Sequence, residues 1–140
     1  MNDKVTRIID AMMDKDLFSQ WLGIERLEEH QGYCRLRMTC RPEMCNGFGL
    51  IHGGISFSFA DSALAFVCNS PGRHALSIEC SISHIRPLHP GDILIAIAEQ
   101  KSLGNRIGIY EVRVEKEDGE LVALFKGTAF RKDKEWEPND

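Results

Sequence analysis

Apolar residues change their spacing along the chain, and these changes separate helical from extended parts. Between residues 5 and 13 they recur three and four positions apart, which predicts an amphipathic helix over about 4–14. A shorter apolar cluster spans 17–24. It is expected to pack as a turn of helix over the edge of the core, with Gly23 ending that turn. Alternating positions then predict strands over 24–29 and 33–40, joined by a turn at 30–32.

The stretch 46–69, NGFGLIHGGISFSFADSALAFVCN, is composed almost entirely of small and apolar residues after its first few positions. From Gly53 onward it has the length of a helix of about four turns and is apolar on nearly every face. Such a helix has to be buried. Its single charge, Asp61, is therefore expected to be paired or to have a chemical role. Ser70, Pro71 and Gly72 form a stop signal after it.

The remainder of the chain reads as sheet, with strands expected over 75–85, 93–98, 107–115 and 121–130. The first of these alternates, which predicts that Ser77 lies on a polar face and Cys80 on the opposite, apolar face. The strand 93–98 is apolar on both faces, as a strand covered on both sides would be. The charged tail, about 131–140, is expected to fray. Hairpin-length connections make the sheet antiparallel, so the pattern predicts one α+β domain over 1–140, a curved sheet wrapped around one long helix.

Composition narrows the function classes. The chain has 140 residues and a formal net charge of −4, which argues against a nucleic-acid partner because no cationic excess exists to neutralise phosphates. Apolar runs are too short for a membrane span, and the acidic N-terminus is unlike a signal peptide, so we expect a cytoplasmic protein. The five cysteines contain no C-x-x-C pair and, with the histidines, match no zinc spacing. Neither a metal nor another cofactor is expected.

The sequence also carries motifs of a known family. Asn46, Gly49 and His52-Gly53-Gly54 form an N-x-x-G-x-x-HGG loop, and Asp61 follows Gly53 by eight residues. Further matching segments are Leu76-Ser77-Ile78-Glu79, Ile85-Arg86-Pro87 and Pro90-Gly91-Asp92. Together these motifs resemble the hotdog-fold thioesterases of the PaaI (phenylacetic acid degradation) type, over roughly 17–130. The resemblance implies a hotdog fold and an acyl-CoA thioesterase for aryl or medium-chain acyl groups. It also implies a homodimer in which the HGG loop of one subunit faces the Asp of its neighbour, often within a homotetramer.

The residues support this chemistry independently. A helix that starts at Gly53 presents unpaired N–H groups and the positive end of its dipole. Gly53 and Gly54 leave that end bare, so a carbonyl oxygen can approach the Gly53 N–H as an oxyanion does in a tetrahedral intermediate. Asp61 is expected to have a raised pKa in its apolar setting, which makes it a better base. It would activate water or attack the thioester directly to give a mixed anhydride, and both routes remain open.

Helix geometry adds a constraint on where the reaction occurs. Eight residues separate Gly53 from Asp61, an axial rise of about 12 Å. One thioester carbon cannot lie within about 3 Å of both groups in one chain. The two groups would therefore come from chains related by symmetry, which places the active site at a dimer interface.

Other residues have two interpretations each. His52 would polarise the thioester or only shape the loop and cap the helix, and Asn46 would orient water or substrate or simply form the turn beside Gly47. Ser77 aligns with a family residue that hydrogen-bonds the nucleophilic water, or it is an ordinary solvent-facing strand residue. For Asp61 itself the alternative is a buried carboxylate satisfied by backbone N–H groups or an arginine. Substrate contacts are assigned to Gly54 and, for the coenzyme A phosphates, to Arg86 and Arg106.

Two rival functions remain. A hotdog enoyl-CoA hydratase or dehydratase pairs Asp with His, but here His52 lies nine residues before Asp61 and no second histidine follows on the helix. A non-catalytic acyl-CoA-binding module would be expected to lack Asp61 or the bare Gly53.

Overall fold

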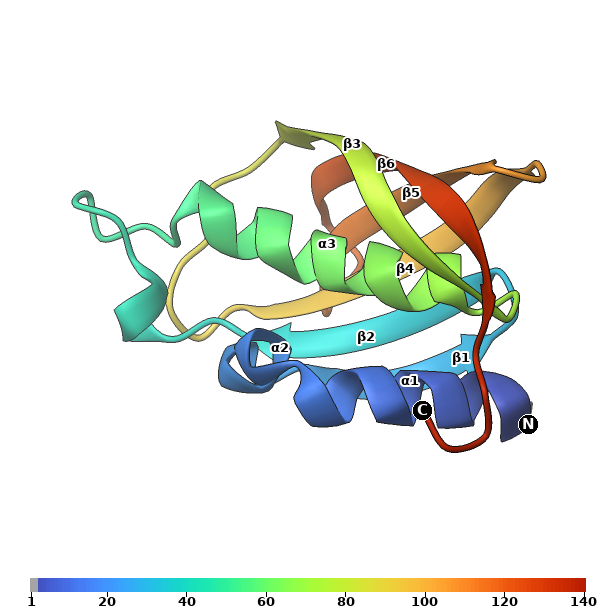
Figure 1. Cartoon of the computed structure of the whole chain (residues 1–140). Coiled ribbons are helices and arrows are strands. Elements are labelled where there is room, and N and C mark those ends of the chain that lie inside the picture. The colour runs from blue at the N-terminus through green and yellow to red at the C-terminus, as the bar shows by residue number, and fades with distance from the viewer. Residues whose placement is uncertain (1–2) are drawn as a thin grey trace.

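A single antiparallel sheet curves around one long helix in the computed structural model, which describes residues 3–140 (Figure 1). The strands lie in the order β1-β2-β4-β5-β6-β3. This confirms the predicted α+β hotdog architecture. No helix within 3–140 is both long and apolar enough to cross a membrane. The helical elements are α1 (Asp3–Lys15), α2 (Leu17–Leu22), the 3-10 turn η1 (Pro42–Met44) and α3 (Gly53–Asn69). The strands are β1 (Glu25–His30), β2 (Tyr33–Thr39), β3 (Arg73–His84), β4 (Ile93–Leu103), β5 (Ile107–Lys116) and β6 (Leu121–Glu135).

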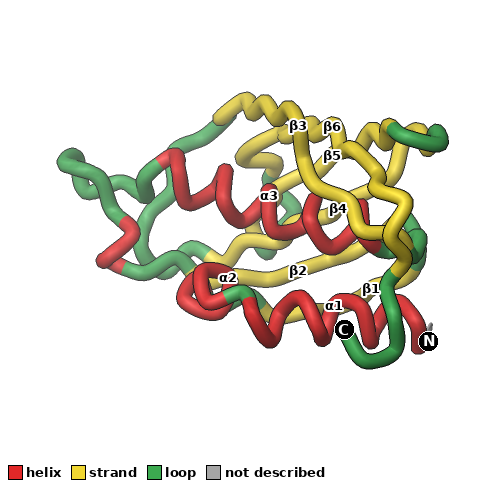
Figure 2. The backbone as a smooth tube through the Cα atoms, viewed as in Figure 1, coloured by secondary structure: helices red, strands yellow, loops and turns green. Residues whose placement is uncertain are grey.

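Helix α3 lies in the concave side of the sheet and forms the centre of the core (Figure 2). Phe59, Leu64 and Phe66 are fully buried, as the all-round apolar pattern predicts. Close approach between helix and sheet depends on Gly127 in β6, where an added Cβ would lie only 2.4 Å from Leu64 Cδ2. The buried helix predicted from 46–69 is therefore confirmed.

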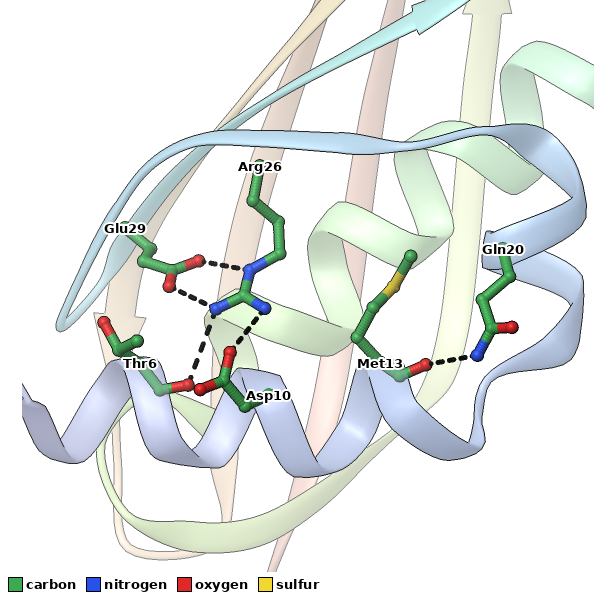
Figure 3. Close-up of polar contacts among 6 residues, drawn as sticks. All are labelled: Thr6, Asp10, Met13, Gln20, Arg26 and Glu29. Atoms are coloured by element: carbon green, nitrogen blue, oxygen red, sulfur yellow. Dashed lines mark hydrogen bonds and ion pairs between the residues drawn. The ribbon is translucent and has the colours of Figure 1, made fainter.

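The N-terminal helices α1 and α2 pack along one side of α3, and α1 also contacts β1 (Figure 1). Arg26 in β1 ties α1 to the sheet, because its guanidinium bonds Asp10 Oδ1 at 2.7 Å and both carboxylate oxygens of Glu29 (Figure 3). Asp16, between α1 and α2, accepts hydrogen bonds from the Ser19 backbone N–H (2.9 Å) and hydroxyl (2.6 Å) and so caps α2. The Ser19 hydroxyl also bonds the Ser62 hydroxyl at 2.8 Å, which anchors α2 to α3 beside Asp61.

The register of β3 overturns its predicted alternation. Ser77 pairs with Ala129 but Glu79 pairs with Thr128, so one surplus residue bulges from the strand between them. Paired residues point to the same side of a sheet, and Ala129 is fully buried against the core. Ser77 therefore shares the helix-facing side with Cys80, which pairs with Gly127. The prediction that Ser77 lies on the face opposite Cys80 was wrong, because the bulge shifts the phase of the strand, but Ser77 is solvent-exposed as expected.

Two further expectations need correction. In β4 only the side of Leu94 and Ala96 is fully buried, whereas the alternate isoleucines on the convex side are half-buried, so one face is not covered within this chain. The tail does not fray after residue 130, because β6 continues to Glu135 along β3. Trp136 then stacks on His74 with ring centroids 4.0 Å apart and donates from Nε1 to Asn69 Oδ1 at 3.0 Å. Trp136 thus anchors the charged tail, which the sequence had suggested would be free.

Candidate functional site

The N-terminus of α3 offers one free backbone donor. His52 is the N-cap, and its Nδ1 accepts the Gly54 N–H at 2.8 Å. A Cβ on residue 54 would lie 3.0 Å from that Nδ1, so glycine makes room for the imidazole. The Gly53 N–H has no hydrogen-bond acceptor among residues 3–140 and is solvent-exposed. The geometry therefore gives His52 the capping role, occupies the Gly54 donor and leaves the Gly53 N–H unpaired among the described residues.

The loop before α3 is held by Asn46. Its Oδ1 accepts the N–H groups of Phe48 (2.9 Å) and Leu50 (3.2 Å), and its own N–H bonds the Leu50 carbonyl at 2.7 Å. Asn46 is thus a turn former, as the simpler interpretation expected. The amide Nδ2 engages no group in the described part of the chain, so it remains available to a substrate or water.

An open pocket of about 330 Å³ lies beside this helix terminus. It brings together three residues singled out from the sequence, Asn46, Gly53 and Arg86. Arg86 is exposed, and its nearest anion is the Glu120 carboxylate, at 3.7 Å. Arg106 is not in this pocket; it lies in the β4–β5 turn and pairs with Asp133 at 2.8 Å.

A residue that the sequence did not single out, His84, also lines the pocket. It ends β3 and pairs with the buried Ala123, so it faces α3. Its Nε2 lies 3.2 Å from where a Cβ on Gly53 would be, and its Nδ1 lies 3.3 Å from the Ser56 hydroxyl. No local pattern marks it, because the contact depends on how β3 crosses the end of α3.

Asp61 lies two turns further along α3 and is half-buried. Its Oδ1 is 3.8 Å from the Cys80 sulfur, and no arginine, lysine or histidine pairs with it in residues 3–140. Burial raises the pKa of Asp61 above its ordinary value, the Cys80 thiol lowers it in part, and the Asp16 carboxylate raises it further. The carboxylate therefore lacks the arginine partner of the alternative interpretation and has the raised pKa that the apolar run predicts.

The bulge in β3 gives Asp61 two polar neighbours on one face. Burial and the Asp61 charge raise the pKa of the Cys80 thiol, and a hydrogen bond from Ser77 lowers it. Ser77, Cys80 and Asp61 therefore form a short polar chain between β3 and α3. Sequence reasoning missed Cys80 because it placed Ser77 and Cys80 on opposite faces.

The contact between Cys80 and Asp61 predicts how the Asp61 pKa responds to substitution of Cys80. Cys80→Ala removes the only donor within residues 3–140 that lowers the Asp61 pKa, so this pKa is expected to rise. Cys80→Ser retains a donor and is expected to leave the Asp61 pKa near the wild-type value. A carbon-13 NMR titration of the carboxyl groups measures both. A fall or no change in Cys80→Ala would show that the thiol does not act on Asp61.

Comparison with known proteins adds independent findings. A family model described as Thioesterase superfamily matches residues 48–123. The chain is 35% identical to acyl-coenzyme A thioesterase PaaI of Escherichia coli over 94% of its own length and 94% of that protein. The structure of E. coli PaaI, from the phenylacetic acid degradation operon, matches with a TM-score of 0.91 at 34% identity and covers 94% of this chain and 96% of that one. A mutant structure of phenylacetic acid degradation protein PaaI from Thermus thermophilus matches with a TM-score of 0.80 at 36% identity, over 84% of this chain and 100% of that one.

Proposed function

The chain belongs to the Thioesterase superfamily, and from that premise we propose that it hydrolyses aryl or medium-chain acyl-CoA thioesters to a free acid and coenzyme A. The observation that carries the proposal is that α3 presents both an unpaired N–H donor and a carboxylate. The uncapped Gly53 N–H opens into a pocket, and the half-buried Asp61 carboxylate has no cationic partner among the described residues. Aryl or medium-chain specificity rests on the likeness to PaaI proteins.

In the proposed reaction Asp61 takes a proton from water as the water oxygen attacks the thioester carbon. The carbonyl electron pair moves to oxygen, where the Gly53 N–H stabilises the negative charge. The carbon–sulfur bond then breaks with its electron pair on sulfur, and coenzyme A is released. Direct attack by Asp61, giving a mixed anhydride that water hydrolyses, uses the same two groups. Ser77 is proposed to hold the attacking water, and Asn46 to orient water or substrate through its free amide.

We propose that each site is shared by two chains of a homodimer. Helix α3 runs without interruption from Gly53 to Asn69, so the axial separation of about 12 Å between Gly53 and Asp61 holds in this fold. β3 lies at one edge of the sheet and carries Leu76 and Ile78 with exposed fractions of 48% and 57%. An apolar edge of this kind is suited to pairing with a second copy. Sedimentation of a monomer at assay concentration would contradict the shared site.

A homotetramer is proposed from the convex side of the sheet. Ile93, Ile95 and Ile97 form a half-buried row there, flanked by charged side chains of both signs on β2 and β5. A second dimer that packs on this face would cover the isoleucine row and form ion pairs with the charged side chains beside it.

We further propose a cytoplasmic location, and contacts of Arg86 and Arg106 with the coenzyme A phosphates. Arg106 would have to leave Asp133 to make such a contact.

The function is tested with a panel of acyl-CoAs whose hydrolysis is followed by chromatography of free coenzyme A. Chromatography avoids thiol reagents, which the protein's own five free cysteines would also consume. Release is expected from aryl or medium-chain members. No release from any member would refute the thioesterase, hydration of an enoyl-CoA in its place would support the hydratase, and binding without turnover would support the binding module.

A further inference from the structure

We propose that His84 is a catalytic residue that donates a proton to the coenzyme A sulfur as it departs. The inference rests on the proposed thioesterase function and extends it to the leaving group, for which neither Gly53 nor Asp61 has a role. It begins from the position of the imidazole, which lines the same pocket as the Gly53 N–H and packs directly against that residue.

Hydrogen bonding sets which ring nitrogen can act. The Ser56 hydroxyl donates to the Gly53 carbonyl at 3.1 Å, so its proton is already engaged. Its oxygen can then only accept from His84 Nδ1, 3.3 Å away. A proton on Nδ1 satisfies this contact and leaves Nε2, 3.2 Å from where a Cβ on Gly53 would be, as the ring nitrogen free to meet the substrate. Ser56 is almost fully buried in α3, so this orienting contact is built on a rigid element.

The pocket also indicates on which side the sulfur lies. A thioester oxygen that accepts the Gly53 N–H at about 2.9 Å has its acyl chain on one side and its sulfur on the other. Arg86, two residues beyond His84, lines the same pocket and presents a cation suited to the coenzyme A phosphates. His84 contacts Gly53 and lies two residues from Arg86, so we place a coenzyme A arm bound at Arg86 beside the His84 ring. The sulfur is therefore on the side of Nε2.

The step balances without a further reactant. The tetrahedral intermediate collapses, the oxyanion pair re-forms the carbonyl, and the carbon–sulfur bond breaks with its electrons on sulfur. Sulfur takes the proton from the His84 imidazolium. The neutral ring regains a proton from solvent, and Asp61 loses to solvent the proton that it took from the attacking water. A thiolate is a fair leaving group unaided, so the contribution grows as the thiol becomes less acidic.

The test is a series of thioesters with one acyl group and thiols of decreasing acidity, from an aryl thiol to an alkyl thiol. In His84→Phe, kcat/KM is expected to fall about 100-fold for the alkyl thioester and by no more than about threefold for the aryl thioester. The dependence of rate on thiol acidity thus becomes steeper. Ser56→Ala removes the hydrogen bond that favours one tautomer of His84. In this variant the dependence of kcat/KM on thiol acidity is also expected to become steeper, but less so than in His84→Phe.

Matched variants separate this role from a structural one. His30→Phe removes an exposed histidine in the β1–β2 hairpin, outside the pocket, and should leave the dependence unchanged. An unchanged dependence in His84→Phe, or an equal loss for every thioester, would overturn the proposal. If the wild-type protein releases no thiol from any acyl-CoA, the proposed function fails instead, so the two failures are distinguishable.

Discussion

Replacing Asp61 by Asn is expected to lower kcat for acyl-CoA hydrolysis by about three orders of magnitude. The amide keeps the size of the side chain but can neither take a proton from water nor attack the thioester. Substrate binding at the Gly53 end should be retained, so KM is expected to change much less than kcat. Initial-rate kinetics with the best acyl-CoA of the panel measure both. Wild-type turnover in this variant would show that another group is the base or nucleophile.

The same variant should not lose stability at neutral pH. The folded-state pKa of Asp61 lies above its unfolded value because of burial, so the folded protein favours the protonated form. The favourable contribution is present below the unfolded pKa and is lost as pH rises through the folded one. Asn carries no charge, so the melting temperature at pH 7 should equal or exceed that of wild type, with the difference vanishing in acid. Asp14→Asn, on the exposed surface of α1, is the control. A large fall in melting temperature would mean that lost activity reflects unfolding.

Gly53→Pro is expected to lower kcat by a factor of about 10²–10³, because it deletes the N–H that we propose as the oxyanion donor. Proline is tolerated as the first residue of a helix, where the N–H has no partner within the helix. His52 already has φ −59° and ψ 137°, the extended conformation that a residue before proline prefers. The substitution therefore removes one N–H while α3 is preserved, which circular dichroism can verify.

Gly53→Ala is the matched control for this variant. It keeps the N–H and adds the Cβ that proline also brings, 3.2 Å from His84 Nε2. The imidazole can move by the few tenths of an ångström required, so the loss in kcat should be much smaller than with proline. Equal losses in the two variants would show that crowding, and not the missing donor, is responsible.

The two inactive variants together test the shared site. In a heterodimer of Gly53→Pro and Asp61→Asn chains, one site carries both substitutions and the other carries neither. Random co-assembly should therefore restore about a quarter of wild-type activity, because half of the dimers are mixed and each has one intact site. A site built within one chain would stay inactive in every combination.

Much of the fold is predictable because its signals are local. The all-round apolar run of α3 and the turns between the later strands are read within a few residues of themselves, and each matches an observed element. The bulge beside Ser77 has no such signal, since its register depends on β6, about fifty residues later. The tail strand was missed for the same reason: β3 supplies its partners, and Trp136 anchors it to α3.

The residues of the candidate site likewise fall into those with a local sequence signal and those placed only by contacts between distant elements. Gly53 and Asp61 belong to one continuous motif, and helix geometry alone gives their separation. His84 and Cys80 lie on another element and reach the helix only through the path of β3, so no spacing rule finds them. The sequence likewise leaves open whether the His52 imidazole caps α3 or contacts substrate, because both roles call for the same residue at the same place; in the structure it is the cap.

The surplus residue in β3 makes the composition of the site depend on strand length. Before the bulge the odd-numbered Ser77 faces α3, and after it the even-numbered Cys80 and His84 do so. Deleting the surplus Ile78 would restore a simple alternation without turning any side chain, because Ser77 and Glu79 already oppose the adjacent residues Ala129 and Thr128. Such a deletion would leave Ser77, Cys80 and His84 facing α3 and would remove only the local bend and twist that the bulge adds. A deletion elsewhere in β3, with no compensating bulge, would instead invert the faces of one part of the strand and so change the polar groups around Asp61.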